Sequence, residues 1–124
     1  MIGFEIFVYR ADLVSDPAAN WPEEQALLVS WLVGGFHGLD WIDNLTKAGK
    51  ANDLGGNGYP LRYTALAKDL LPIITNGIPR PAGPPIIGDE YYLPAGWIGK
   101  PEICEALSAI PSDQVLLINA WDQS

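Results

Sequence analysis

Two apolar runs near the ends of the chain predict strands that lie side by side in a small sheet. In the first run, residues 2–10, Phe4 and Ile6 fall on one face while Phe7 falls on the other. Apolar residues on both faces are typical of a largely buried strand. The second run, residues 114–121, is strongly apolar, so we expect the two strands at the centre of the sheet.

Four further segments have apolar residues at helical spacing. They cover residues 20–34, 40–49, 61–76 and 101–110, and each is bounded by a residue type that is common at helix ends. The segment 61–76 has the clearest apolar stripe, so we take it as the main helix around which the core packs. The predicted fold is α+β: a small sheet containing the N- and C-terminal strands, packed against about four helices, with a proline-rich flap over residues 78–101. The residues predicted to be buried are Trp31, Leu66, Leu70 and Leu117.

The turn before the main helix is rich in glycine. Gly55, Gly56 and Gly58 fall within four positions, and we expect at least one of them to have φ above zero. Pro60 would then begin the helix, where its missing N–H does no harm. The turn lacks the Gly-Lys-Ser/Thr ending of a phosphate loop, so it does not indicate nucleotide binding.

Composition and charge describe a globular acidic protein. The chain has 124 residues, of which 48% are hydrophobic and 18% charged, and this predicts a single domain over residues 1–124. The net charge of −8 repels nucleic acid and anionic membranes and attracts basic partners. No apolar run approaches the roughly 18 residues of a membrane span, and the N-terminal run does not resemble a signal peptide. One cysteine allows no internal disulfide, so we expect a cytoplasmic protein.

Several residues that often carry chemistry are present, but their surroundings favour structural roles. His37 has no nucleophile in a recognisable motif around it, so we interpret it as a turn histidine with a local hydrogen bond. Cys104 falls on the apolar side of the predicted last helix, which indicates a buried, inert thiol. Asp40 and Asp43 are interpreted as a helix cap and a first-turn carboxylate. We therefore predict no catalytic residue, no metal site and no cofactor.

An acidic and aromatic cluster in the proline-rich segment is the predicted binding surface. Carboxylates beside aromatic rings are typical of a protein contact that captures a basic partner. The surrounding prolines limit the freedom of the segment before binding, so less ordering entropy would be lost on association. Two further carboxylates, one facing out from a helix and one in a polar loop, are secondary candidates. The predicted partner-binding residues are Asp89, Glu90, Tyr91, Tyr92 and Trp97, with Asp43 and Asp53 as the secondary pair.

The overall profile resembles the immunity proteins of bacterial toxin systems. Members are small, single-domain, cytoplasmic and often acidic, and they block a cognate toxin by binding it. The resemblance extends over the whole chain as a profile, without a diagnostic motif, so no residue roles are carried over. It implies a protein that is not an enzyme and that binds and neutralises a basic toxin domain.

Two other classes of function stay open. A small hydrolase would use carboxylates such as Asp40, Asp43 or Asp53 as acid and base, and it would need a deep pocket that brings two of them together. A carbohydrate- or peptide-binding module would instead present its tryptophans and tyrosines in a row on a concave face. A purely structural interpretation requires no partner, because Tyr92 and Trp97 could simply anchor the long loop to the core.

Overall fold

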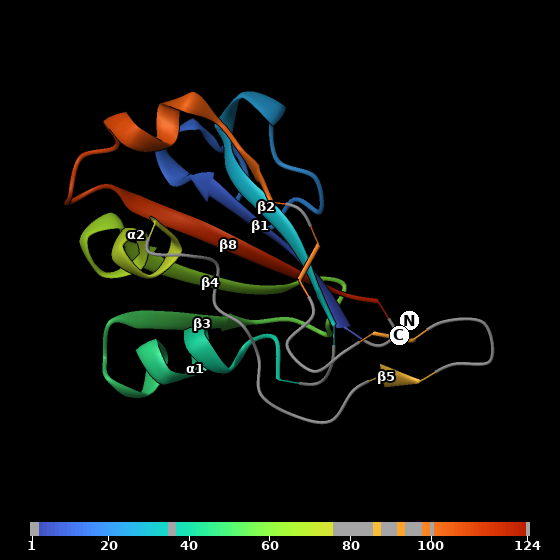
Figure 1. Ribbon diagram of the computed structural model, residues 1–124. Helices are drawn as coiled ribbons and strands as arrows, with labels where there is room; N and C mark the ends of the chain where they lie inside the picture. The colour runs from blue at the N-terminus through green and yellow to red at the C-terminus, as the bar shows by residue number, and fades with distance from the viewer. Residues whose placement is uncertain are drawn as a thin grey trace.

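The computed structural model describes residues 3–34, 37–75, 98–99 and 101–123, together with the backbone at 86–87 and 92–93. Its main feature is a six-stranded antiparallel sheet with the strand order β3-β4-β8-β1-β2-β7 (Figure 1). The two terminal strands pair with each other at the centre, as the sequence predicts. The strands are β1 Gly3–Arg10, β2 Leu27–Gly34, β3 Ala51–Gly55, β4 Leu61–Leu66, β7 Glu102–Ile103 and β8 Val115–Asp122.

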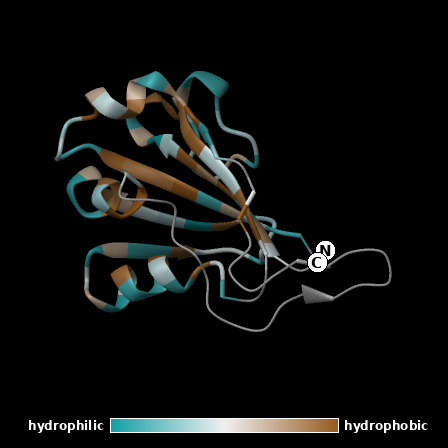
Figure 2. Ribbon diagram, in the orientation of Figure 1, coloured by the Kyte–Doolittle hydropathy of each residue, from teal (hydrophilic) through white to brown (hydrophobic). Residues whose placement is uncertain are grey.

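One face of the sheet is covered by two α-helices, and we call it the helical face. Helix α1, Asp40–Lys47, and helix α2, Ala67–Thr75, bury Ile42 and Leu70 against this face. Figure 2 shows that hydrophobic residues follow β8 and the neighbouring central strands beneath these helices. Neither helix has the length and apolar character needed to cross a membrane. The main core therefore lies between the sheet and α1 and α2.

The opposite face, which we call the loop face, is partly covered by the segment that joins β1 to β2. This segment contains the 3₁₀ turns η1, Ala11–Leu13, and η2, Glu24–Ala26. Its Val14 and Ala26 pack with Tyr9 and Leu117 in a second, smaller cluster of buried residues. Strands with apolar side chains on both faces are thus covered on both faces, as their composition requires.

The prediction of about four helices is wrong, and the largest error is at residues 20–34. This segment forms η2 and then β2, which pairs along its length with β1. Buried Val29, Trp31 and Val33 alternate along β2 and face the helices. Seven of the eight residues 26–33 are apolar, so this run fits a helical period as well as the strand period. The long-range pairing with β1 decides in favour of the strand.

The predicted main helix is also partly wrong, because its first third is a strand. β4 pairs with β8, and α2 begins at Ala67, whose backbone N–H donates to the carbonyl of Gln114 at 2.8 Å. Pro60 therefore precedes a strand and does not begin a helix. Leu66, the last residue of β4, is half-buried where the sequence predicts burial, whereas Leu70 is fully buried as predicted.

The predicted helix at 101–110 is replaced by the short edge strand β7 and a 3₁₀ turn, η3, Glu105–Ala109. β7 pairs with β2, and the N–H of Cys104 extends this edge by donating to the carbonyl of Leu28 at 2.8 Å. The segment thereby covers part of the edge that β2 would otherwise expose. Cys104 is exposed, so the prediction of a buried thiol is wrong.

The proline-rich segment lies mostly outside the described residues. Within it, β5, Ile86–Ile87, pairs with β6, Tyr92–Leu93, in a separate two-stranded antiparallel sheet. The described backbone of the predicted proline-rich flap therefore includes two short strands that pair with each other.

Candidate functional site

The predicted partner-binding cluster cannot be built as a site from the described residues. Tyr92 is placed in β6 by its backbone alone. The other members, Asp89, Glu90, Tyr91 and Trp97, lie outside the described residues. The cluster stays a prediction, and the surface described below lies elsewhere in the fold.

The two secondary candidates, Asp43 and Asp53, meet around one tyrosine. Tyr63 of β4 lies opposite Asp53 of β3, and its hydroxyl donates to Asp43 Oδ1 of α1 at 3.3 Å. Burial raises the pKa of Tyr63 well above its usual value, and the nearby charges of Asp43 and Asp53 raise it further. Asp53 is therefore in an edge strand, not in a polar loop. Both carboxylates are exposed, and Asp43 also joins α1 to the sheet.

His37 makes the local contact that the sequence predicts. Its Nδ1 lies 3.1 Å from Asp40 Oδ2 in the turn before α1, and both side chains are exposed. Asp40 is the first residue of α1, and no side chain caps this helix, so the cap interpretation is wrong. Among the described residues, no three His, Cys, Asp or Glu side chains are grouped as a metal site would need.

Three aromatic rings form a continuous cluster on the loop face. The rings of Trp21 and Trp121 are stacked, with centroids 4.7 Å apart and planes within 9° of parallel. The edge of Phe7 meets Trp21 at a centroid distance of 5.9 Å. Trp21 is 66% exposed, so a large aromatic surface faces solvent next to the central strands.

A shallow hollow of about 260 Å³ begins at Phe7, at the border of this aromatic cluster. Most of its lining comes from side chains of the loop face, which follow the strand register: Phe7 lies opposite Ser30, and Ser30 lies opposite Glu102. Glu5, two residues before Phe7 in β1, lies opposite Leu32 in β2 and Trp121 in β8. The other residues that line the hollow are Glu5, Leu32, Glu102 and Trp31.

The two carboxylates of this hollow have no cation beside them among the described residues. The ion pairs recorded there are Arg10 with Asp12 and His37 with Asp40. The pKa of Tyr9 is raised to about 12, mainly by burial and to a smaller extent by the nearby charge of Glu5. We call Glu5, Phe7, Trp21, Glu102 and Trp121 the acidic–aromatic face.

Two polar anchors hold the segment that carries Trp21. Arg62 of β4 donates from Nη2 to the carbonyl of Ala18 at 2.9 Å and to Asn20 Oδ1 at 3.2 Å. Glu23 accepts hydrogen bonds from the hydroxyl and the backbone N–H of Ser15, and these bonds hold the pKa of Glu23 below its usual value. Trp21 is thus positioned between two anchored points of its segment.

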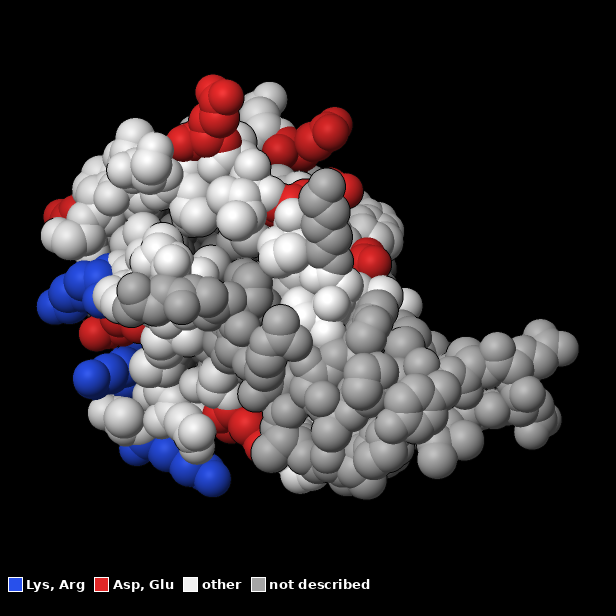
Figure 3. Space-filling model, viewed as in Figure 1, with Lys and Arg blue, Asp and Glu red and all other residues white. Residues whose placement is uncertain are grey.

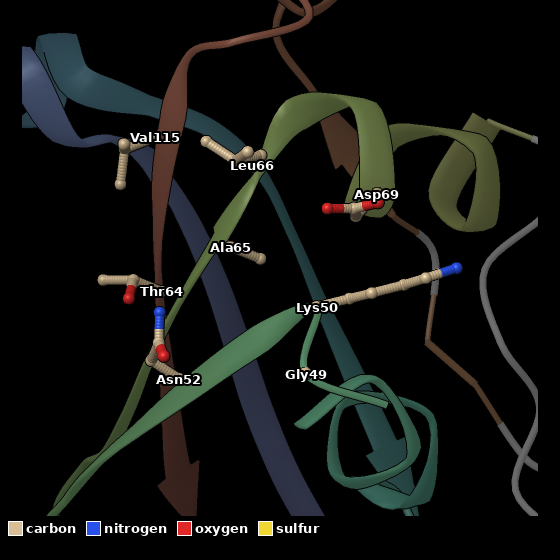
Figure 4. Close-up of a pocket in the computed structure, with 8 residues that line it drawn as sticks. All are labelled: Gly49, Lys50, Asn52, Thr64, Ala65, Leu66, Asp69 and Val115. Atoms are coloured by element: carbon tan, nitrogen blue, oxygen red, sulfur yellow. The ribbon is translucent and has the colours of Figure 1, made fainter. Parts of the chain in front are cut away.

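A second hollow, of about 180 Å³, lies at the other end of the sheet, between β3, β4, α2 and the start of β8. In Figure 4 the side chains of Lys50 and Asp69 extend to one side of the strands, and those of Asn52 and Thr64 lie on the other. Figure 3 shows basic side chains gathered at the edge of the molecule beside the helices and acidic ones near the 3₁₀ turns.

The sequence contains little local signal for the acidic–aromatic face. Its members come from β1, the β1–β2 segment, β7 and β8, so they are separated by up to 116 positions between Glu5 and Trp121. Trp21 stands between Asn20 and Pro22 in an otherwise polar connection, and a large aromatic residue in such a place is the one hint. Comparison of the chain with protein-family models, curated proteins and solved structures found no match.

Proposed function

We propose that this protein binds and neutralises a basic protein, most simply a toxin domain, through its acidic–aromatic face. The observation that carries the proposal is the position of Glu5 and Glu102 around a hollow beside the exposed Trp21, with no cation partner among the described residues. Carboxylates next to an exposed aromatic ring match the chemistry of a basic partner. The net charge of −8 would attract such a partner from a distance.

The way the face is built supports a binding role. Phe7, Glu5 and Trp121 extend from the paired strands β1 and β8, and Trp21 is held by its stack and by the anchors of its segment. Side chains on a rigid sheet lose little freedom when a partner docks. Tryptophan is the residue type most often found as an energetic anchor at interfaces, where truncation costs about 2 kcal/mol or more.

The test begins with the tagged chain as bait in an extract of its native host. We expect a basic protein to be retained by the wild type, and to be lost with Trp21→Ala or with Glu5→Gln combined with Glu102→Gln. Glu24→Gln combined with Asp113→Asn is the matched control, because it removes two exposed negative charges that do not line the hollow. The captured protein is then purified, and its activity is measured with and without the chain.

Inhibition of the captured protein by the wild type, lost in the two face variants and kept in the control, is the expected outcome. A captured protein that keeps its full activity when the chain is bound contradicts neutralisation. Capture that is equal for the wild type and both face variants contradicts the assignment of the face.

Carbohydrate binding is the second candidate, because the outer ring face of Trp21 is exposed beside a hollow. Sugar rings stack on exposed aromatic side chains, so a glycan would quench tryptophan fluorescence on binding. Titration with an oligosaccharide panel distinguishes the two candidates. Saturable quenching that is lost in Trp21→Ala would favour carbohydrate binding, and an absence of quenching would favour binding of a basic protein.

A further inference from the structure

We propose that the hollow between Glu5 and Glu102 is a subsite for one arginine side chain of the partner. This inference rests on the proposed function and deepens it, because it names the group that the acidic–aromatic face recognises. It is argued from the lining of the hollow, from the register of the strands and from the chemistry of the guanidinium group.

The strand register places the two carboxylates on opposite sides of β2. Glu5 is on β1 and Glu102 is on β7, with the residues Ser30 and Leu32 of β2 between them. Strand spacing separates their backbones by about 10 Å across the sheet and about 7 Å along it. Glutamate side chains are long enough to reach inward over β2 from both sides, so a cation in the hollow can contact both.

The floor and wall of the hollow suit the rest of an arginine side chain. Phe7 and Leu32 offer apolar surface to the methylene groups, and the ring of Phe7 can stack with a guanidinium plane. Ser30 adds a hydroxyl that can accept a hydrogen bond. The volume of about 260 Å³ leaves room for one such side chain and is too shallow to enclose a large ligand.

Arginine fits this lining better than lysine does. Guanidinium has five N–H donors in one plane, so it can satisfy two separated carboxylates and the Ser30 hydroxyl at the same time. An ammonium group is a compact, strongly hydrated charge, and it would reach one carboxylate at the cost of its hydration. Glu5 is half-buried and Glu102 is exposed, and the arginine of the partner would bring a cation between these two carboxylates.

The experiment uses three small probes that differ in the side-chain head group. The ¹⁵N-labelled protein is titrated with N-acetyl-arginine amide, N-acetyl-lysine amide and N-acetyl-citrulline amide, and amide shifts are followed by nuclear magnetic resonance. We expect the arginine probe to give saturable shifts at Phe7, Ser30 and Leu32, with a dissociation constant in the millimolar range. The lysine probe should bind about five-fold more weakly, and the uncharged citrulline probe should give no saturable shift.

Variants of the protein test the same lining. Glu5→Gln combined with Glu102→Gln should weaken the arginine probe by about ten-fold, while Glu24→Gln combined with Asp113→Asn should leave its affinity unchanged. Equal affinity for all three probes overturns the inference, and so does arginine binding that survives in the Glu5 and Glu102 double variant. An arginine probe that shifts only amides outside the hollow overturns it as well.

The failure of this inference differs from the failure of the proposed function. If the captured partner needs Trp21 but the arginine probe does not enter the hollow, the subsite is wrong and the function stands. If the probe binds as expected but no partner depends on the acidic–aromatic face, the function is wrong and the subsite stands. With a partner in hand, an arginine-to-lysine scan of its surface should find one position where affinity falls at least about five-fold, and this loss should vanish in the Glu5 and Glu102 double variant.

Discussion

Trp21 and Trp121, 100 positions apart in the sequence, are stacked with ring centroids at 4.7 Å and planes 9° from parallel. The stack ties the β1–β2 segment to the last strand, on the face of the sheet that the helices leave free. Because Trp21 is 66% exposed, its outer ring surface is available to a partner even while its inner surface is packed. One residue therefore contributes to both the fold and the candidate site.

The stack should make a measurable contribution to stability. Trp21→Ala removes the contacts with Trp121 and Phe7, and we expect it to lower the free energy of unfolding by about 0.5–1.5 kcal/mol. Denaturant unfolding measures this change. Leu13→Ala is the control, since Leu13 is also exposed but lies outside the aromatic cluster, and it should change stability by less than about 0.5 kcal/mol. Equal losses in the two variants would mean that the stack does not stabilise the segment.

The core prediction contrasts two leucines that the sequence treats alike. Leu70→Ala should cost about 2–5 kcal/mol, because Leu70 of α2 is fully buried against the sheet. Leu66→Ala should cost less, about 1 kcal/mol, since Leu66 is half-buried at the end of β4 and lines the second hollow. Both values come from denaturant unfolding, and a larger loss at Leu66 than at Leu70 would contradict the placement of the strand and the helix.

Sequence reasoning predicts an element correctly where its residues fit one period only, and it fails where they fit both the helical and the strand period. Helix α1 is predicted correctly because Ile42 and its neighbours give a local amphipathic pattern that no other element fits. The terminal strands are predicted correctly because their apolar runs are too long and too β-branched for a loop. In β2 and β4, by contrast, both periods fit the same residues, and pairing with strands far away in the sequence decides between them.

The candidate site is harder still to predict. Glu5 and Phe7 are visible in the first strand, but nothing local places Glu102 across β2 from Glu5 or stacks Trp21 on Trp121. Strand order brings these residues together, and strand order is a long-range property that a single sequence does not encode as a pattern. Charge and aromatic content are properties of the composition, so the sequence can suggest an acidic and aromatic surface but cannot locate it in the fold.

The glycine turn before β4 should tolerate alanine unequally. Gly55, Gly56 and Gly58 have φ values of 83°, 120° and 95°, so the prediction of left-handed backbone is confirmed. Gly55→Ala should cost about 1 kcal/mol, because φ is unfavourable but a Cβ there would meet open space. Gly56→Ala should cost more, because its Cβ would also clash with the carbonyl oxygen of Pro60. Denaturant unfolding of the two variants should give this order, and a reversed order would contradict the geometry of the turn.

Stability should fall at high pH because of Tyr9. Burial, with a smaller effect of Glu5, raises the pKa of Tyr9 from 10.0 to about 12 in the folded protein. The unfolded chain then loses this proton first, so the stabilisation is complete below pH 10 and is lost as the pH rises from 10 towards 12. The part of this loss that comes from Tyr9 should reach at most about 2–3 kcal/mol, and Tyr63, whose pKa is also raised by burial, adds to the total.

Unfolding of Tyr9→Phe across the same pH range isolates this effect. The variant lacks the phenol, so its stability should fall less steeply than that of the wild type between pH 10 and 12. Tyr59→Phe is the matched control, because Tyr59 is 50% exposed whereas Tyr9 is 3% exposed. If Tyr9→Phe and Tyr59→Phe have the same slope, Tyr9 is not the group responsible.

The last prediction separates the overall charge of the protein from the charge of its acidic–aromatic face. Glu5→Lys combined with Glu102→Lys changes the net charge from −8 to −4, and so does Asp89→Lys combined with Glu90→Lys in the proline-rich segment. Steering by overall charge alone would slow the association of a basic partner equally in both double variants. A contact at the acidic–aromatic face should in addition speed dissociation in the Glu5 and Glu102 variant only, because like charges would then meet in the hollow.

Association and dissociation rates of the captured partner at low and high salt measure the difference. Raising the salt should slow association and change dissociation less. Faster dissociation in the Asp89 and Glu90 variant alone would indicate that the partner contacts the proline-rich segment, as the sequence predicts. It would contradict the proposal that the partner binds the acidic–aromatic face.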